Sequence, residues 1–210
     1  MAKILIGDDH SIVRQGLKQI LSESREFYEC GEAENGQVVL DMILKDKWNV
    51  VILDISMPGL SGLDILKEIK KIKPKLPVLV LTMYSEDQFA IRSIKAGASG
   101  YLTKDSAPDE LIKAIKKLLE GGKYVSLHLA EILAADIGRV AKDMLHASLS
   151  DREFQVMRLI ASGKTIKEIS NELVLSIKTI STYRSRILDK MGMKSNAGLT
   201  YYAIQNRLII

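Results

Sequence analysis

The chain has 210 residues, 47% apolar and 27% charged, and its 30 basic and 26 acidic side chains give a net charge of +4. This balance is typical of a globular protein and excludes a disordered chain or an acidic tail. No apolar run approaches the roughly 20 residues that cross a bilayer, Asp8 and Asp9 argue against a signal peptide, and the single cysteine, Cys30, excludes an internal disulfide. We therefore expect a cytoplasmic protein.

The first 122 residues alternate short apolar runs with amphipathic stretches of helical spacing. The runs that predict strands cover residues 3–7, 27–32, 49–53, 77–81 and 99–102. Between them apolar residues share one helix face, as Leu63, Leu66 and Ile69 do. Such alternation predicts an α/β domain with a five-stranded, parallel, doubly wound sheet of the flavodoxin-like kind.

The strand pattern ends near Ser126, and the rest of the chain is helical. A linker of residues 123–146 contains a helix, because its apolar residues follow helical spacing: Leu129, Ile132, Leu133, Ile137, Val140 and Met144. Residues 147–210 predict an all-α domain of four helices, with a capping box at Ser150 and Glu153. After Gly163, further helices are expected over residues 165–172, 176–191 and 196–207.

Polar side chains follow the predicted strands at the points where the strands end. They are Asp8, Asp9, Asp54, Thr82 and Lys104. The carboxyl ends of parallel strands meet at one edge of a sheet, where ligands bind. Three carboxylates in one small site repel one another without a cation, and hard oxygen ligands suit Mg²⁺. A carboxylate can also be the nucleophile in phosphoryl transfer, with the lysine ammonium binding the phosphoryl oxygens.

Each of these residues could also have a purely structural role. Asp8 and Asp9 could cap the following helix, and Asp54 could belong to the turn around Met57-Pro58-Gly59. A single threonine or lysine is more often exposed to solvent than functional. What favours a site is the common edge and order of the whole set.

Several segments resemble the receiver domain of two-component response regulators over residues 3 to about 121. They are Gly7-Asp8-Asp9-His10, Asp54-Ile55-Ser56-Met57-Pro58-Gly59 with Gly62, Thr82, and Gly100-Tyr101-Leu102-Thr103-Lys104. The resemblance implies that a sensor histidine kinase phosphorylates Asp54, with Lys104 and Thr82 binding the phosphoryl group. It implies a Mg²⁺ site made of Asp8, Asp9, Asp54 and the backbone carbonyl of Ser56. It also implies that Tyr101 is a switch residue, which turns inward as Thr82 moves.

One position departs from that pattern. Many receiver domains have a proline after the lysine, with a cis peptide bond before it, whereas this chain has Asp105. A cis bond to a residue other than proline costs about 2.5–4 kcal/mol. We therefore do not expect a cis bond between Lys104 and Asp105.

Basic residues are concentrated in the last part of the chain. Residues 146–210 carry ten basic and five acidic side chains, whereas residues 1–125 carry 18 of each. On a helical wheel of residues 176–191, Ile180 and Ile187 mark the apolar side. The opposite, free face carries Lys178, Ser181, Thr182, Ser185 and Asp189, flanked by Thr179 and Arg186. Of these, we expect Lys178, Thr179, Ser181, Thr182, Ser185 and Arg186 to contact DNA. Such a helix can enter the major groove, with hydroxyls at base edges and cations at phosphates; the alternative is a solvated face of a helix bundle. Arg184, near the apolar side, is expected in a structural ion pair.

Residues 147 to about 208 resemble the LuxR-type helix-turn-helix module. Matching stretches are Leu149-Ser150-Asp151-Arg152-Glu153, Gly163-Lys164-Thr165-Ile166-Lys167-Glu168-Ile169, Lys178-Thr179-Ile180-Ser181-Thr182-Tyr183 and Ile187-Leu188-Asp189-Lys190-Met191-Gly192. A receiver followed by this module is the architecture of the NarL/FixJ family. The resemblance implies a transcription regulator that binds two half-sites of double-stranded DNA as a homodimer, with the last helix contributing either dimer contacts or core packing.

Together these features predict a regulator whose phosphorylation at Asp54 switches dimerisation and DNA binding, and not an enzyme beyond that chemistry. One alternative is a metal-dependent hydrolase with an aspartate nucleophile, but only His10 is at hand as a general acid, and it more readily begins a helix. Another is a constitutive DNA-binding protein with an inert receiver. The chain has no phosphate-binding glycine loop and no dinucleotide fingerprint, which argues against a nucleotide-driven activator.

Overall fold

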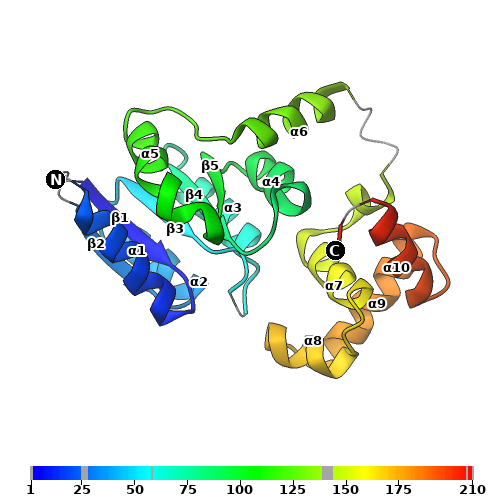
Figure 1. The fold of residues 1–210 in the computed structure, drawn as a ribbon. Helices are drawn as coiled ribbons and strands as arrows, with labels where there is room; N and C mark the ends of the chain where they lie inside the picture. The colour runs from blue at the N-terminus through cyan, green and yellow to red at the C-terminus, as the bar shows by residue number, and fades with distance from the viewer. Residues whose placement is uncertain (1, 25–27, 58, 139–143, 207, 210) are drawn as a thin grey trace. The chain divides into compact units, whose positions relative to one another are not determined.

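The computed structural model describes residues 2–24, 28–57, 59–138, 144–206 and 208–209 (Figure 1). The chain divides into two compact units, Met1–Ala130 and Glu131–Ile210. In the described part of the chain, no helix has the length and apolar character needed to cross a bilayer. Several parts of the expected elements lie outside the described residues: Phe27 of the second expected strand, Pro58 of the expected turn, residues 139–143 of the expected linker helix, and Arg207 of the last expected helix.

A five-stranded parallel sheet forms the centre of the first unit, as the sequence predicted. Its strands, in the order β2-β1-β3-β4-β5, are β1 (Ala2–Gly7), β2 (Tyr28–Ala33), β3 (Val50–Leu53), β4 (Val78–Thr82) and β5 (Gly100–Thr103). Strands β3 and β4 are buried along their whole length, because helices cover both faces and leave no polar side. The chain steps to one side of β1 for β2 and to the other for β3, so the order reverses between β1 and β3.

The helices of this unit lie on both faces of the sheet. They are α1 (Ser11–Glu23), α2 (Gly36–Lys45), α3 (Gly62–Ile72), α4 (Glu86–Lys95) and α5 (Ala107–Leu119), the last preceded by the 3₁₀ turn η1 (Lys104–Ser106). Leucines of α1 and α5 pack with Ile4, Ile52 and Leu81 of the sheet in one core. At the start of α3 a Cβ on Gly62 would lie 2.2 Å from the Ile55 backbone, so only glycine allows this helix to approach the loop after β3.

The linker begins against the sheet. After α5, Tyr124 forms an isolated bridge to Gly100 of β5, and the helix α6 (Leu127–Gly138) follows. Met144, which we expected within this helix, instead precedes the 3₁₀ turn η2 (Leu145–Ser148).

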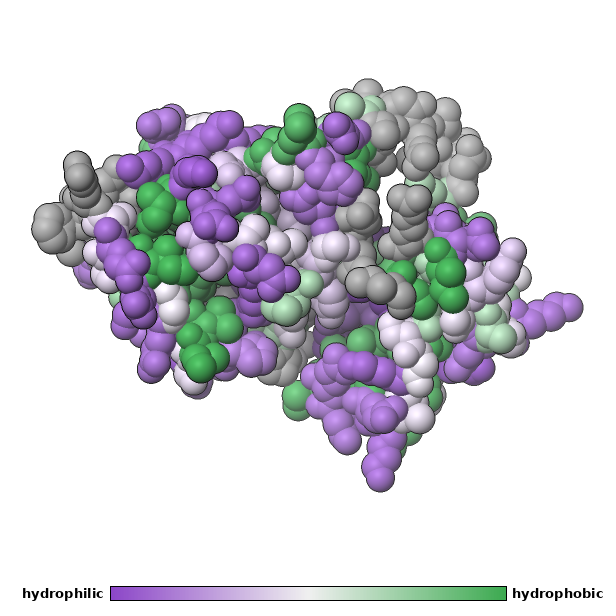
Figure 2. Space-filling model, viewed as in Figure 1, coloured by the Kyte–Doolittle hydropathy of each residue, from purple (hydrophilic) through white to green (hydrophobic). Residues whose placement is uncertain are grey.

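Four helices make up most of the second unit: α7 (Asp151–Ala161), α8 (Ile166–Leu173), α9 (Ile177–Met191) and α10 (Asn196–Gln205). The capping box of Ser150 and Glu153 is confirmed, and a second one joins Thr165 to Glu168 before α8. Helix α9 ends at Met191, and its C-cap is Gly192, whose φ of 64° lies in the left-handed region that favours glycine. The core gathers one face from each helix, with these residues among it: Phe154, Ile169, Ile180, Ile187 and Leu199. Hydrophilic residues cover the exposed side of α8 in Figure 2.

Candidate functional site

The predicted carboxylates meet where the strand order reverses. Asp8 and Asp9 follow β1 and Asp54 follows the adjacent strand β3, whose end is joined to β1 by the hydrogen bond that Asp54 N donates to Gly7 O (2.8 Å). One carboxylate oxygen each of Asp8, Asp9 and Asp54 and one ring nitrogen of His10 all lie within 4.8 Å of one another. The parallel sheet therefore brings together the acidic residues that the strand ends predicted.

Lys104 joins two of these carboxylates. Its Nζ lies 2.6 Å from Asp54 Oδ2 and 2.7 Å from Asp8 Oδ2. Asp54 and Asp8 are only 1% and 2% exposed, so the ammonium balances charges that water hardly reaches. The sequence suggested Lys104 as a ligand for phosphoryl oxygens but did not suggest that it bridges Asp8.

Burial and charge act against each other in this cluster. Burial raises the pKa of the Asp54 carboxyl above its ordinary value, against the opposing effect of Lys104. Burial also lowers the pKa of the Lys104 ammonium, but the carboxylates of Asp54 and Asp8 outweigh it, and the pKa lies above its ordinary value. The lysine therefore stays charged, while the aspartate is held in an environment that resists its charge.

The remaining oxygen of Asp54 and its neighbours form a hydrogen-bonded group. Asp54 Oδ1 accepts from the Ser56 backbone N–H at 2.8 Å. The hydroxyls of Ser56 and Thr82 are 3.1 Å apart, and Thr82 is fully buried at the end of β4. Ser56 therefore links Thr82 to Asp54, through its hydroxyl on one side and its backbone N–H on the other.

Asp9 contributes an enclosed oxygen to the cluster. Its Oδ1 is buried and makes no hydrogen bond with the residues that the structure describes, although His10 Nδ1 lies 3.0 Å away and would form an ion pair if protonated. His10 itself is the N-cap residue of α1, in agreement with its expected place at a helix start. Buried carboxylate oxygens that lack hydrogen-bond donors are a donor set that fits a hard cation such as Mg²⁺.

Tyr101 points inward and is fully buried. Its hydroxyl donates to the backbone carbonyl of Tyr84 at 2.8 Å and lies 3.3 Å from that of Ser85. Tyr84 N in turn donates to Thr82 Oγ1 at 3.4 Å. The aromatic side chain is therefore tied to the loop that leads from Thr82 to α4. The peptide bond between Lys104 and Asp105 is trans, as are the others that the structure describes.

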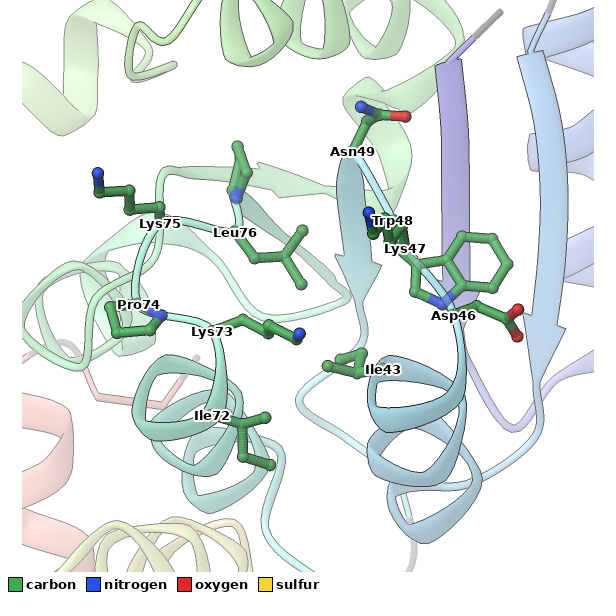
Figure 3. Close-up of a pocket in the computed structure, with 11 residues that line it drawn as sticks. Ile43, Asp46, Lys47, Trp48, Asn49, Ile72, Lys73, Pro74, Lys75 and Leu76 are labelled. Carbon is green, nitrogen blue, oxygen red and sulfur yellow. The ribbon is translucent and has the colours of Figure 1, made fainter.

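A separate hollow of about 690 Å³ lies at the opposite, amino ends of β3 and β4 (Figure 3). Ile43, Lys73 and Leu76 point toward its centre, whereas Lys75 points away from it. None of the predicted site residues lines it. The acidic cluster and this hollow are therefore distinct features of the first unit.

The second unit presents the polar face of α9 that the helical wheel predicted. Lys178, Ser181, Thr182, Ser185 and Arg186 are exposed, while Thr179 is half-buried. The half-buried position of Thr179 follows from its place in the cap of α9, where its hydroxyl lies 2.8 Å from Ser176 Oγ.

Other basic residues of this unit have structural roles. The expected ion pair of Arg184 is not found among the described residues; its Nε donates to the neutral side-chain amide of Asn196 at 2.7 Å. Arg152 and Arg158 are buried, and they donate to Gln155 Oε1 (2.6 Å) and to the Leu208 carbonyl (2.7 Å). A count of charges along the sequence therefore overstates the cations that are free to meet a polyanion.

The two units match two known families. Residues 4–116 match the response regulator receiver domain, and residues 147–203 match the luxR family of bacterial regulatory proteins. The chain belongs to the NarL/FixJ family of response regulators. Receiver domains typically bind Mg²⁺ at an acidic pocket, and this chain has a cluster of acidic residues, Asp8, Asp9 and Asp54, at the carboxyl ends of β1 and β3.

Relatives of this response regulator match along almost its whole length. Response regulator GacA of Pseudomonas aeruginosa is 34% identical, over 100% of this chain and 98% of its own. RcsB from Salmonella enterica serovar Typhimurium, bound to promoter rprA in the presence of the phosphomimetic BeF₃⁻, has a TM-score of 0.66 at 31% identity and covers 96% of this chain and 98% of its own. A structure of two RcsB dimers bound to two parallel DNAs has a TM-score of 0.59 at 30% identity, over 97% and 98% of the chains.

Proposed function

We propose that this response regulator is a transcription regulator controlled by phosphorylation of Asp54, which receives the phosphoryl group from a sensor histidine kinase. The observation that carries the proposal is the pairing of a buried carboxylate with a buried ammonium, 2.6 Å apart, at the carboxyl ends of β1 and β3. An isolated buried carboxylate is costly, whereas one that is paired with a cation and accepts from the Ser56 backbone N–H is stabilised as a nucleophile.

The transfer itself needs few groups from the protein. An oxygen of Asp54 attacks phosphorus, the new O–P bond forms as the N–P bond of the donor phosphohistidine breaks, and the histidine ring keeps the electron pair and takes up a proton. Lys104 Nζ binds an oxygen of the incoming group, and the Thr82 hydroxyl donates to another. Lys104 also opposes the effect of burial on the pKa of Asp54, and so favours the ionised carboxylate that a nucleophile requires.

Asp8, Asp9, Asp54 and the backbone carbonyl of Ser56 would hold Mg²⁺. When bound, the ion supplies positive charge that offsets both the clustered carboxylates and the phosphoryl oxygens. The unbonded oxygen of Asp9 supports this assignment, because a buried acceptor without a donor is costly unless something else binds it.

The aspartyl phosphate would act on the rest of the chain through Thr82 and Tyr101. A phosphoryl oxygen that accepts from Thr82 draws that hydroxyl away from Ser56 and Tyr84, and the loop that holds Tyr101 must adjust. The altered surface would favour the homodimer, which places two copies of α9 on two half-sites of double-stranded DNA. The RcsB dimers on DNA support this arrangement, and the exposed apolar residues Tyr201 and Ile204 of α10 are suited to a contact between copies.

On α9, the polar face divides into two roles. Lys178 and Arg186 would bind phosphates, which fix the position of the helix without reading sequence. Ser181, Thr182 and Ser185 would reach base edges, where a hydroxyl can both donate and accept. Thr179 would both take part in the N-terminal cap of α9, through its hydroxyl beside Ser176, and contact the DNA groove.

The decisive experiment measures intact mass after incubation with acetyl phosphate and Mg²⁺, followed by binding to promoter DNA. We expect the wild type to gain one phosphoryl mass and to bind DNA more tightly. Asp54→Ala should gain none, and Asp54→Asn should bind DNA without any response to the donor. If the wild type gains no mass under any metal condition, the protein is a DNA-binding regulator that does not depend on phosphorylation, and the proposal is wrong.

A further inference from the structure

The linker is anchored to the receiver unit at two points beside Tyr101. The first lies on β5, where Tyr124 N donates to the Ser99 carbonyl at 2.9 Å and Tyr124 pairs with Gly100. A Cβ on Gly100 would lie 2.8 Å from the Tyr124 carbonyl oxygen, so glycine is what allows the linker to approach so closely. This anchor holds the residue directly before Tyr101.

The second anchor is a hydrogen bond between the side chains of Ser126 and Glu86, which lie 40 residues apart in the sequence. Ser126 Oγ donates to Glu86 Oε2 at 2.7 Å and accepts from Leu129 N at 2.9 Å. The serine therefore caps the first turn of α6 and uses its one proton to bind the first residue of α4. Leu129, in that same turn, is fully buried, so the start of α6 is packed as well as hydrogen-bonded.

Both anchors adjoin the groups that Tyr101 binds. Gly100 precedes Tyr101, and Glu86 follows Ser85, whose carbonyl lies 3.3 Å from the Tyr101 hydroxyl. Only three residues separate Thr82 from Glu86. A displacement of Thr82 or Tyr101 must therefore either carry Glu86 with it or be absorbed within the Tyr84–Ser85 segment.

We propose that Glu86 is a positioning residue that passes the state of the Asp54 site to the interdomain helix α6 through its hydrogen bond to Ser126. The proposal rests on the proposed function, because it needs a change at Thr82 and Tyr101 to transmit. A hydrogen bond to a carboxylate is shorter and stronger than one between neutral groups, so a shift of Glu86 displaces the first turn of α6 or breaks its tether. Helix α6 would itself remain capped, because the bond from Leu129 N to Ser126 does not depend on Glu86.

Substitutions at Glu86 and Ser126 can separate the hydrogen bond between these two side chains from the cap that Ser126 provides to α6. Ser126→Thr keeps both the donor and the cap. Ser126→Asp keeps a cap acceptor for Leu129 N but has no proton to donate and repels Glu86. The double variant Glu86→Lys with Ser126→Asp restores the contact as an ion pair of reversed polarity, which a loss of fold could not imitate. Glu131→Ala removes an exposed charge elsewhere on α6 and is the matched control.

The measurement is amide hydrogen exchange in the first two turns of α6 of the full chain, with and without acetyl phosphate and Mg²⁺, with intact mass recorded on the same samples. In the wild type, Ser126→Thr and Glu131→Ala, phosphorylation should change the exchange rate about three- to tenfold, as expected for the loss of one hydrogen bond. In Ser126→Asp the rate should not respond to the donor, although the phosphoryl mass is still gained. The double variant should regain the response.

The possible failures differ. If the wild type is phosphorylated and hydrogen exchange in α6 does not change, then the relay, the transmission from Glu86 through Ser126 to α6, is wrong, and the proposed function stands. A response that persists in Ser126→Asp, or one that the double variant does not restore, would also overturn it. If no phosphoryl mass appears in the wild type, the proposed function fails, and the relay fails with it.

Discussion

The two units of this protein expose their functional groups to water in opposite ways. In the receiver unit Asp8, Asp54 and Thr82 are at most 2% exposed, and each is held by a partner that is itself buried or nearly so. In the helical unit the predicted DNA-binding residues of α9 lie mostly in solvent. A buried polar group can store and change an interaction energy of several kcal/mol, whereas an exposed one adds little until a partner removes the water. The burial in the first unit suits the phosphorylation switch that we propose, and the exposure in the second suits binding to DNA.

The largest effect should come from removing the cation of the buried cluster. Lys104→Met leaves Asp8 and Asp54 buried without their partner, and breaking a buried pair costs about 3–5 kcal/mol. We expect the receiver unit to lose about that much free energy of unfolding at pH 7, measured by urea denaturation. Addition of Mg²⁺ should recover part of the loss, because a cation would again offset the carboxylates.

The matched control is Lys71→Met, which removes a lysine that is 70% exposed and paired with Glu68. We expect it to change the stability by less than about 0.5 kcal/mol. If the two variants were equally mild, the comparison between buried and exposed charges would break down for this protein.

A smaller, pH-dependent effect is expected at Glu153, a carboxylate of the helical unit that resembles the receiver cluster in burial. Its side chain is 4% exposed and accepts from Lys190 Nζ (2.6 Å) and Ser150 N (2.8 Å). Burial raises its pKa, but these bonds outweigh burial, and the pKa of Glu153 lies below its ordinary value. A depressed pKa in the folded state means that stability is present at neutral pH and lost as the pH falls through that pKa.

The test compares the wild type with Glu153→Gln by denaturant unfolding between pH 7 and pH 3. At pH 7 the variant should be less stable by about 1–2 kcal/mol, since it loses the ion pair with Lys190 and keeps only a neutral oxygen to accept from Ser150 N. The difference should shrink below about pH 4, where protonated Glu153 resembles glutamine. Glu172→Gln, at the 40% exposed partner of Lys164, should show little difference at any pH. A constant difference across the range would contradict the ion-pair explanation.

The smallest effect should come from the exposed face of α9. Lys178→Ala should weaken binding to a duplex of arbitrary sequence by about three- to tenfold at 0.1 M salt, and lower the slope of log affinity against log salt by about 0.9, because one phosphate contact is lost. Ser181→Ala should leave that slope unchanged and alter only discrimination between sequences. Binding is measured by fluorescence anisotropy, with Lys45→Ala in the receiver unit as control. If Lys45→Ala weakened DNA binding equally, the assignment of the DNA contact to α9 would be wrong.

Much of the architecture was predictable because the signals are local. The buried strands β3 and β4 are continuous apolar runs, and the ends of α7 and α9 are marked by Ser150 and Gly192. The acidic cluster was predictable for a different reason: parallel strands end at one edge, so residues 46 positions apart, Asp8 and Asp54, must meet there. Nothing local marks the hydrogen bond between Glu86 and Ser126, since each residue alone is an ordinary surface side chain.

The sequence by itself determined the order of elements, the meeting of carboxylates at one edge and the polar face of α9, because periodicity and strand ends are properties of the chain. Only the tertiary structure decided which partner each charge takes. Lys104 bridges Asp8 and Asp54, Arg184 bonds an amide, and Arg152 and Arg158 turn into the core. The physical reason is that the energy of a charge depends on its burial and on atoms a few ångströms away, and packing brings those atoms from distant parts of the chain.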